Sequence, residues 1–243
     1  MPSQDTLLSA RGLRKQYGAL VVLDGVDFEV RRGDAIGIVG PNGAGKTTLL
    51  SVLSGSQGAS AGAIYFRGAD VSALDAARRC RMGIARTHQV PQPFGGMTVF
   101  ENVLTAATHG GGFKRAEAYD RCIDALALCG MTKVAYRRAE TLGLLDRKRL
   151  ELTRALATNP VVLLLDEIGG GLTDGEATEL VQTIRVLHAR DIAIVWIEHI
   201  VHILLQVAQR LVCMDAGRVI AEGDPKEVLA NATVVDAYLG GGR

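Results

Sequence analysis

The apolar positions along the chain change their spacing several times, and each change indicates an expected element. Leu20–Val30 mixes apolar and alternating positions, as partly buried strands do. Ala35–Gly40 is a short unbroken apolar run that ends in glycine, which is typical of a strand buried on both faces of a parallel sheet. From about Lys46 the apolar residues repeat at helical spacing, and the pattern stops at Gly55. These patterns predict strand, loop and helix in that order.

The pattern differs between about Arg86 and Arg149, where segments broken by glycine and proline surround helical pieces. This change indicates a helical insertion within an α/β core. Buried-strand patterns return at 161–167 and 192–198. Further along, we expect a hairpin that turns at Ala216-Gly217, followed by a helical tail over 225–240.

The composition excludes some classes of protein. Hydrophobic residues make up 48% and aromatics 5%, so a core rich in aliphatic side chains is expected. The 27 basic and 26 acidic residues give a net charge of +1, which offers no electrostatic reason to expect a nucleic-acid partner. No apolar run approaches the roughly 20 residues that span a bilayer. We therefore expect a soluble chain that could serve a membrane only as a peripheral subunit.

The most specific motif is GPNGAGKTT, which lies between the expected strand and helix. It fits the phosphate-binding pattern G-x-x-x-x-G-K-[ST], in which glycines let backbone N–H groups turn toward an anion at a helix N-terminus. Lys46 is expected to bridge the β- and γ-phosphates, and Thr47 to ligate Mg²⁺. The alternative is a glycine-rich turn that only links the two elements. The expected nucleotide-binding residues are Gly40, Pro41, Asn42, Gly43, Ala44, Gly45, Lys46, Thr47 and Thr48.

An acidic pair follows the expected strand at 161–167. Ligands of open α/β sheets gather at the carboxyl ends of strands, so Asp166 and Glu167 are expected near the phosphates. Asp166 would hold the Mg²⁺ shell, and Glu167 would act as general base toward the attacking water. Such a pair can also simply end a strand, but its combination with the phosphate loop favours a nucleotide hydrolase.

The chain lacks the N-K-x-D guanine motif and resembles the ATP-binding subunits of ABC transporters over nearly its whole length. The resemblance implies ATP and Mg²⁺ as cofactors and gives roles to four further residues. Tyr17 would stack on adenine, and Gln89 would touch Mg²⁺ and link the site to the transporter. Asp174 would face a partner subunit, and His199 would contact the γ-phosphate. Lys46, Glu167 and His199 are the expected catalytic residues.

The same resemblance predicts the fold class. It implies an α/β P-loop NTPase with a mainly parallel core sheet, an antiparallel N-terminal β subdomain and an inserted helical subdomain. A single domain would span 1–243. Its core with the β subdomain would comprise 1–88 and 153–243, and 89–152 would form the helical subdomain.

Short motifs resemble one branch of the family, the ATPases of branched-chain amino-acid uptake systems and their amide or urea relatives. These motifs include ARTHQ around Gln89, IEH at His199 and the closing DAYLG. The branch implies a second ATPase subunit, two transmembrane permease subunits and, indirectly, a periplasmic solute-binding protein. The chain would then lie peripherally on the cytoplasmic side of the inner membrane. Three alternatives stay open: an exporter ATPase, a non-transport ABC protein, and a degenerate regulatory subunit.

The segment Leu142–Asp146, LGLLD, departs most from the family. The family has a serine and paired glycines where this chain has Gly143, Leu144 and Leu145. Asp146 is expected to be the N-cap of the next helix. The resemblance implies that this segment serves the nucleotide of a partner subunit, so our hypothesis is an asymmetric heterodimer, with a homodimer as the alternative.

Three smaller expectations complete the interpretation. Ile168 stands where the family usually has a proline after the acidic pair, and Ile200 stands where it usually has an acid after the histidine. The basic run Arg147–Arg149 is expected to lie on a solvated helix face. Phe94 and Met97 belong to a loop that either contacts a membrane subunit or is simply flexible.

Overall fold

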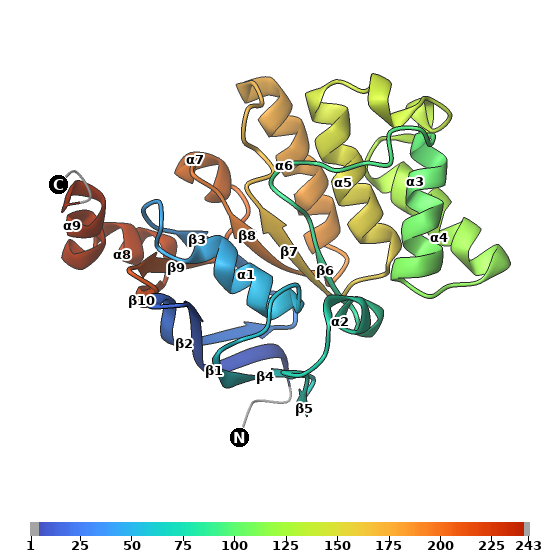
Figure 1. Cartoon of the computed structure of the whole chain (residues 1–243). Coiled ribbons are helices and arrows are strands. Elements are labelled where there is room, and N and C mark those ends of the chain that lie inside the picture. Colours follow the sequence, from blue (N-terminus) through green and yellow to red (C-terminus); the bar gives the residue numbers. More distant parts are fainter. Residues whose placement is uncertain (1–4, 241–243) are drawn as a thin grey trace.

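A computed structural model describes residues 5–240 of the chain, and two β-sheets organise it (Figure 1). The larger sheet has the strand order β10-β9-β3-β8-β7-β6. All its pairs are parallel except the β9–β10 hairpin. The predicted α/β fold with a mainly parallel sheet is therefore confirmed. The strands are β3 (Ala35–Val39), β6 (Ile84–Arg86), β7 (Val162–Asp166), β8 (Ala193–Ile197), β9 (Arg210–Asp215) and β10 (Arg218–Gly223).

The smaller sheet is antiparallel, with the order β2-β1-β4-β5. Its strands are β1 (Thr6–Tyr17), β2 (Leu20–Arg31), β4 (Ala61–Phe66) and β5 (Ala69–Asp70). The apolar pattern did not single out β1, because polar residues and a glycine interrupt it. The register of β1 against β2 shifts between Ala10 and Leu13, and Gly12 between them has φ 55°. An irregularity of this kind lets β1 continue as one strand although its apolar and polar residues do not alternate regularly.

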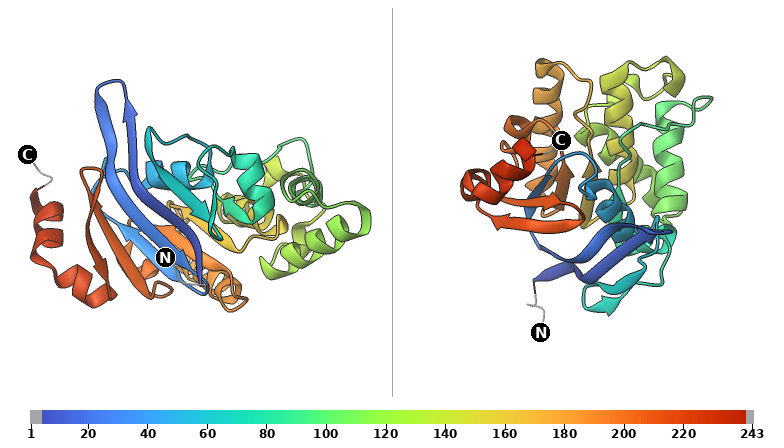
Figure 2. Two further views of the ribbon diagram at one scale, coloured as in Figure 1. Left: turned by 90° about the horizontal axis from the view of Figure 1, so that it is seen from below. Right: turned by 60° about the vertical axis from the view of Figure 1, so that its left-hand side comes forward.

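The helices fall into groups around the larger sheet. Figure 2 shows the inserted helices at the end of the molecule opposite the C-terminal pair. The predicted hairpin turn is confirmed, with φ 44° at Ala216 and 79° at Gly217, but two helices that meet near Asn231 replace the single expected tail. None of the helices within 5–240 is both long and apolar enough to cross a membrane. The helices are α1 (Lys46–Ser54), α2 (Ala76–Met82), α3 (Val99–Thr105), α4 (Arg115–Leu128), α5 (Leu144–Ala157), α6 (Asp174–His188), α7 (Val201–Leu204), α8 (Pro225–Ala230) and α9 (Ala232–Gly240).

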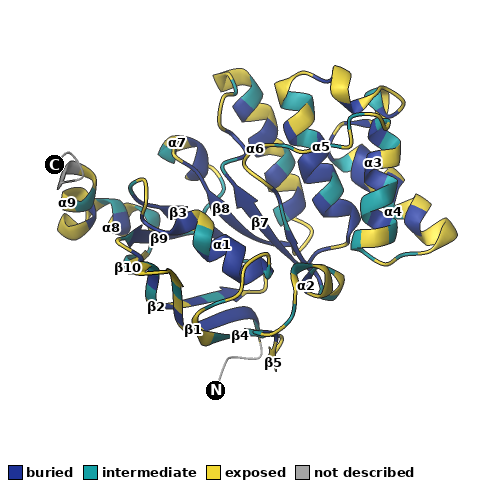
Figure 3. Ribbon diagram, viewed as in Figure 1, coloured by how far each residue is buried: buried dark blue, intermediate teal, exposed yellow. Residues whose placement is uncertain are grey.

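The central strands of the larger sheet, β3, β7 and β8, are buried on both faces, as their dark colour in Figure 3 shows. In β7, Val162 and Leu164 pack into a core that contains α1 and the smaller sheet. Leu163 and Leu165 point the other way and join a core that contains the inserted helices and α6. Burial on both faces explains why the β7 sequence is a continuous apolar run instead of an alternating one.

We expect Leu164→Ala to lower the free energy of unfolding by about 2–5 kcal/mol, because the side chain is fully buried and leaves a cavity. Chemical denaturation measures this loss. Val186→Ala, on the exposed side of α6, is the control and should change stability by less than about 0.5 kcal/mol. Equal losses in the two variants would contradict the burial of Leu164 against the core that contains α1 and the smaller sheet.

Candidate nucleotide-binding site

The glycine-rich loop lies between β3 and α1 and forms one wall of a small cavity. Gly45 precedes the first helical residue, Lys46, and has φ 98°. A Cβ on Gly40 would lie 2.0 Å from the Met214 carbonyl oxygen, and one on Gly45 would lie 2.7 Å from that of Val22. Both positions therefore require glycine for space as well as for backbone angle. The cavity measures about 180 Å³ and is lined by Val22, Asn42, Gly43, Ala44, Gly45, Lys46, Thr47, Thr48 and Glu167.

Lys46 is buried beside this loop. Its Nζ donates to the carbonyl oxygens of Gly40 at 2.7 Å and Pro41 at 2.9 Å. Burial lowers the pKa of Lys46, and the nearby carboxylates of Glu167 and Asp166 oppose that shift. A phosphate anion offers a stronger acceptor than a neutral carbonyl, so the ammonium group suits a bound nucleotide.

Asp166, at the end of β7, comes close to the first turn of α1. Its side chain is 1% exposed, and Thr47 Oγ1 donates to its Oδ1 at 3.2 Å. The hydroxyl and the carboxylate thus place two hard oxygen atoms side by side, which is the ligand chemistry that Mg²⁺ prefers. The described residues therefore fit a magnesium ion shared with nucleotide phosphates.

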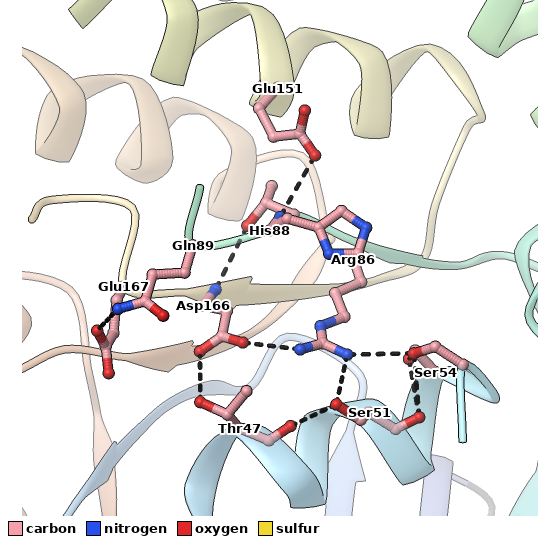
Figure 4. A network of polar contacts seen from close by, with 11 residues as sticks. Thr47, Ser51, Ser54, Arg86, His88, Gln89, Glu151, Asp166 and Glu167 are labelled. Carbon is pink, nitrogen blue, oxygen red and sulfur yellow. Dashed lines mark hydrogen bonds and ion pairs between the residues drawn. The ribbon is translucent and has the colours of Figure 1, made fainter. Parts of the chain in front are cut away.

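Each carboxylate oxygen of Glu167 has its own partner, and Figure 4 shows one of the two, Gln89. Gln89 Nε2 donates to Oε2 of this carboxylate, and His199 Nε2 lies 2.7 Å from Oε1. The backbone of Glu167 has φ 47°, an uncommon value for a residue other than glycine, and its N–H donates to the Ile197 carbonyl at 2.9 Å. The tertiary structure thus fixes both the backbone and the side chain of Glu167.

The structure brings most of the expected site residues together but leaves two apart. Tyr17 lies at the end of β1 and is 46% exposed; its hydroxyl contacts Gln57, and Lys15 Nζ lies 4.9 Å from its ring centroid. Tyr17 does not line the cavity, whereas Val22 does. Asp174 is exposed as the first residue of α6 and does not line the cavity either.

Two expectations about α5 are wrong. The helix begins at Leu144 with Gly143 as its N-cap, so Asp146 lies inside the first turn and is not the cap. An acid there still interacts favourably with the helix dipole. The basic run is not a solvated face as a whole, because Lys148 is 4% exposed and Arg149 pairs with Glu179 at 2.6 Å. Lys148 therefore faces the site and Arg149 faces α6, and only Arg147 of the three is exposed.

Lys148 is one of several site residues that the motifs did not reveal. Its Nζ donates to the carbonyl oxygens of Gln89 at 3.0 Å and Glu167 at 3.3 Å. Burial lowers the pKa of Lys148, opposed by Glu198 and Glu167. Lys148 therefore joins α5 to the loops that carry Gln89 and Glu167. The sequence held one signal of this role: Lys148 is a charged residue on the side of the α5 helical pattern where apolar residues are expected.

Glu198 is a second buried charge near the site. Its Oε1 accepts from the Gly169 N–H at 2.6 Å and from Trp196 Nε1 at 3.1 Å. Burial raises the pKa of Glu198, although these two donors oppose the shift. The carboxylate ties the loop after β8, which carries His199, to the loop after β7.

The C-terminal helix also reaches the phosphate loop. The Gly40 N–H donates to Tyr238 Oη at 2.7 Å, between positions 198 residues apart. Burial raises the pKa of Tyr238, and the Gly40 N–H opposes this shift. Nothing in the phosphate-binding motif indicates this contact, because its two partners come from opposite ends of the domain.

The phosphate loop follows β3, and the acidic pair Asp166 and Glu167 lies at the end of β7. His199 follows β8, which lies between these two strands in the sheet. This arrangement defines a P-loop nucleotide hydrolase. Comparison with known proteins specifies the class. A model described as "ABC transporter" matches residues 23–169, and one described as "Branched-chain amino acid ATP-binding cassette transporter" matches residues 218–243. The chain therefore belongs to the ABC transporter ATP-binding family, as its motifs predicted, and is an ATPase.

Individual relatives agree with this assignment. The chain is 34% identical to the high-affinity branched-chain amino acid transport ATP-binding protein LivG of Escherichia coli, over 96% of this chain and 98% of the relative. It is 33% identical to a probable LivG of Methanocaldococcus jannaschii, over 96% and 97%. Among solved structures, the ADP conformation of MJ1267, an ATP-binding cassette of an ABC transporter, superposes with a TM-score of 0.88. That chain is 33% identical, and the match covers 97% of this chain and 99% of MJ1267.

We expect Tyr238→Phe to weaken ATP binding about 2- to 10-fold, because the buried Gly40 N–H loses its acceptor and the loop loses a support. Equilibrium titration with a fluorescent ATP analogue measures the change. Tyr136→Phe, which removes a hydroxyl from a largely exposed ring, is the control. If both variants bound ATP as the parent does, α9 would have no part in ordering the loop.

Proposed function

We propose that this ATPase powers the uptake of branched-chain amino acids or related small polar solutes through membrane partner subunits. The observation that carries the catalytic part is the position of Glu167, whose two carboxylate oxygens contact Gln89 and His199 separately. The match of 218–243 to the branched-chain amino acid model and the named relatives support the solute class.

In the proposed mechanism, Lys46 and the backbone N–H groups of 43–48 bind the β- and γ-phosphates of ATP. Magnesium, when bound, neutralises charge on those phosphates, and Thr47, Asp166 and Gln89 are the residues proposed to hold it. Glu167 orients the attacking water and accepts its proton. His199 contacts the γ-phosphate and, with Gln89, keeps Glu167 in place.

Two of the proposed contacts need movement or a partner. Tyr17 stacks on adenine only after its hydroxyl leaves Gln57, which the exposed position of the ring allows. Asp174 and the loop before it face a second ATPase subunit. ATP held between two such subunits favours the closed pair, and hydrolysis favours the open one.

A cavity of about 350 Å³ is the proposed binding site for part of a permease subunit. It opens beside β6 and the inserted helices, and its lining includes Phe94, His88 and Arg154. Phe94 and Met97 are partly exposed, and the Arg154 guanidinium lies 5.0 Å from the Phe94 ring centroid. Two permease subunits, with a periplasmic solute-binding protein acting through them, would place the chain at the cytoplasmic face of the inner membrane.

We expect Glu167→Gln to keep ATP affinity and to lower steady-state hydrolysis by roughly 10²- to 10⁴-fold, because the amide cannot accept the proton of the water. Phosphate release from the complex assembled with its partners measures the effect. Glu179→Gln, which alters only a peripheral ion pair with Arg149, is the control. Normal turnover in the Glu167 variant would exclude this residue as the base.

The segment Leu142–Asp146 supports an asymmetric heterodimer. Leu144 is exposed at the start of α5, and a Cβ added to Gly171 would lie 3.2 Å from its Cδ2. A leucine there presents an apolar side chain where the family offers glycine N–H groups to the partner's nucleotide. The same departure favours a second candidate function, that of a regulatory subunit with weak turnover.

In the Glu167→Gln background, we expect the chain alone to stay monomeric with ATP. Gly143→Ser, Leu144→Gly, Leu145→Gly and Asp146→Gln together should yield ATP-dependent dimers, because the missing donors are restored. Light scattering after size exclusion measures mass, and circular dichroism confirms that the variant folds. If the Glu167→Gln chain with its own Leu142–Asp146 segment formed ATP-locked dimers alone, or if the parent chain alone showed full activity, the asymmetry would be refuted.

A further inference from the structure

Asp166 has a second partner besides Thr47, and this partner is a cation supplied by the protein. Arg86, the last residue of β6, places its Nη2 2.7 Å from Asp166 Oδ2. The arginine side chain is 10% exposed and that of the aspartate 1%. The two carboxylate oxygens thus have separate partners, Oδ1 with Thr47 and Oδ2 with Arg86 (Figure 4).

Further contacts fix the position of Arg86. Its Nη1 donates to Ser51 Oγ at 2.8 Å and to Ser56 Oγ at 3.1 Å. Ser51 belongs to α1, and its hydroxyl donates to the Thr47 carbonyl at 2.7 Å. The guanidinium therefore bridges β6, β7 and the helix that follows the phosphate loop. Its fork of donors suits such a bridge better than the single ammonium of a lysine.

A buried carboxylate is strongly destabilising unless a cation compensates its charge. Lys46 does not make this contact, because its Nζ donates to the carbonyls of Gly40 and Pro41. We infer that Arg86 is a positioning residue that acts as a resident counter-cation. It compensates Asp166 through Oδ2 and keeps Oδ1 beside Thr47, where the metal is proposed to bind.

This arrangement has opposite effects in two states. Without metal, Arg86 stabilises the fold by pairing a charge that would otherwise stay uncompensated. With metal, its positive charge lies near a divalent cation and opposes its binding. Arg86 therefore lowers the gain in nucleotide affinity that the metal provides, while it keeps the site ordered between turnovers.

The first experiment tests the ion pair in metal-free buffer with EDTA. Arg86→Met should lower the melting temperature by roughly 5–15 °C, because Asp166 loses its partner. Adding Asp166→Asn to this variant should recover at least half of that loss. Arg79→Met is the matched control, because Arg79 is buried even more deeply than Arg86 but donates only to backbone carbonyls, so Asp166→Asn should not rescue it. Additive losses for Arg86→Met and Asp166→Asn would overturn the inference.

The second experiment measures the affinity for a non-hydrolysable ATP analogue with Mn²⁺ and, separately, with EDTA. The ratio of the two affinities should rise at least about threefold in Arg86→Met and stay unchanged in Arg79→Met. An unchanged or smaller ratio in Arg86→Met would refute the opposition to metal binding. Should the methionine variant fail to fold, Arg86→Gln removes the charge but keeps a donor, and the same rise is expected.

This part of the inference rests on the proposed metal role of Asp166. Asp166→Asn should reduce the Mn²⁺-dependent ratio. An unchanged ratio would overturn that metal role, and the metal-free rescue would still decide whether Arg86 compensates Asp166. The two experiments therefore separate a failure of the proposed function from a failure of the ion pair.

Discussion

The site depends on one buried carboxylate, that of Asp166, at the point where β7 meets α1. A charge this deep must be compensated, so the elements around it are constrained to supply partners. The first turn of α1 supplies the Thr47 hydroxyl, and β6 supplies the Arg86 guanidinium. Because each partner comes from a different element, the ordering of Asp166 also fixes the phosphate loop relative to the sheet.

Glu167, one residue later, extends this constraint to helix α5 and to the loops after β6 and β8. Its backbone N–H is bonded to the end of β8, and its carbonyl oxygen accepts from Lys148 on α5. Its carboxylate contacts Gln89 and His199, which lie on the loops after β6 and β8, respectively. A change at either loop therefore alters the position of Glu167 directly. Such contacts can couple hydrolysis to the arrangement of subunits.

Local chemistry made some features predictable and others not. The phosphate loop could be found because its glycines, lysine and threonines are contiguous and lie between a strand and a helix. The hairpin at Ala216–Gly217 could be found for the same reason. In contrast, Asp146 was misplaced as a cap, because the helix begins two residues earlier at Leu144. Tertiary packing of Leu142 and the α5 face decided that start, not the capping preference of aspartate.

The sequence by itself determined the fold class, the phosphate loop, the acidic pair and the family, because each is encoded in short contiguous patterns. Only the tertiary structure placed Arg86 on Asp166, Lys148 on the Gln89 and Glu167 carbonyls, and Tyr238 on Gly40. These partners lie on separate elements far apart along the chain. A single arginine, lysine or tyrosine carries no local mark of the group it will meet. The sheet order and the burial of charge determine that meeting, because a buried ion or N–H group must find a partner within the fold.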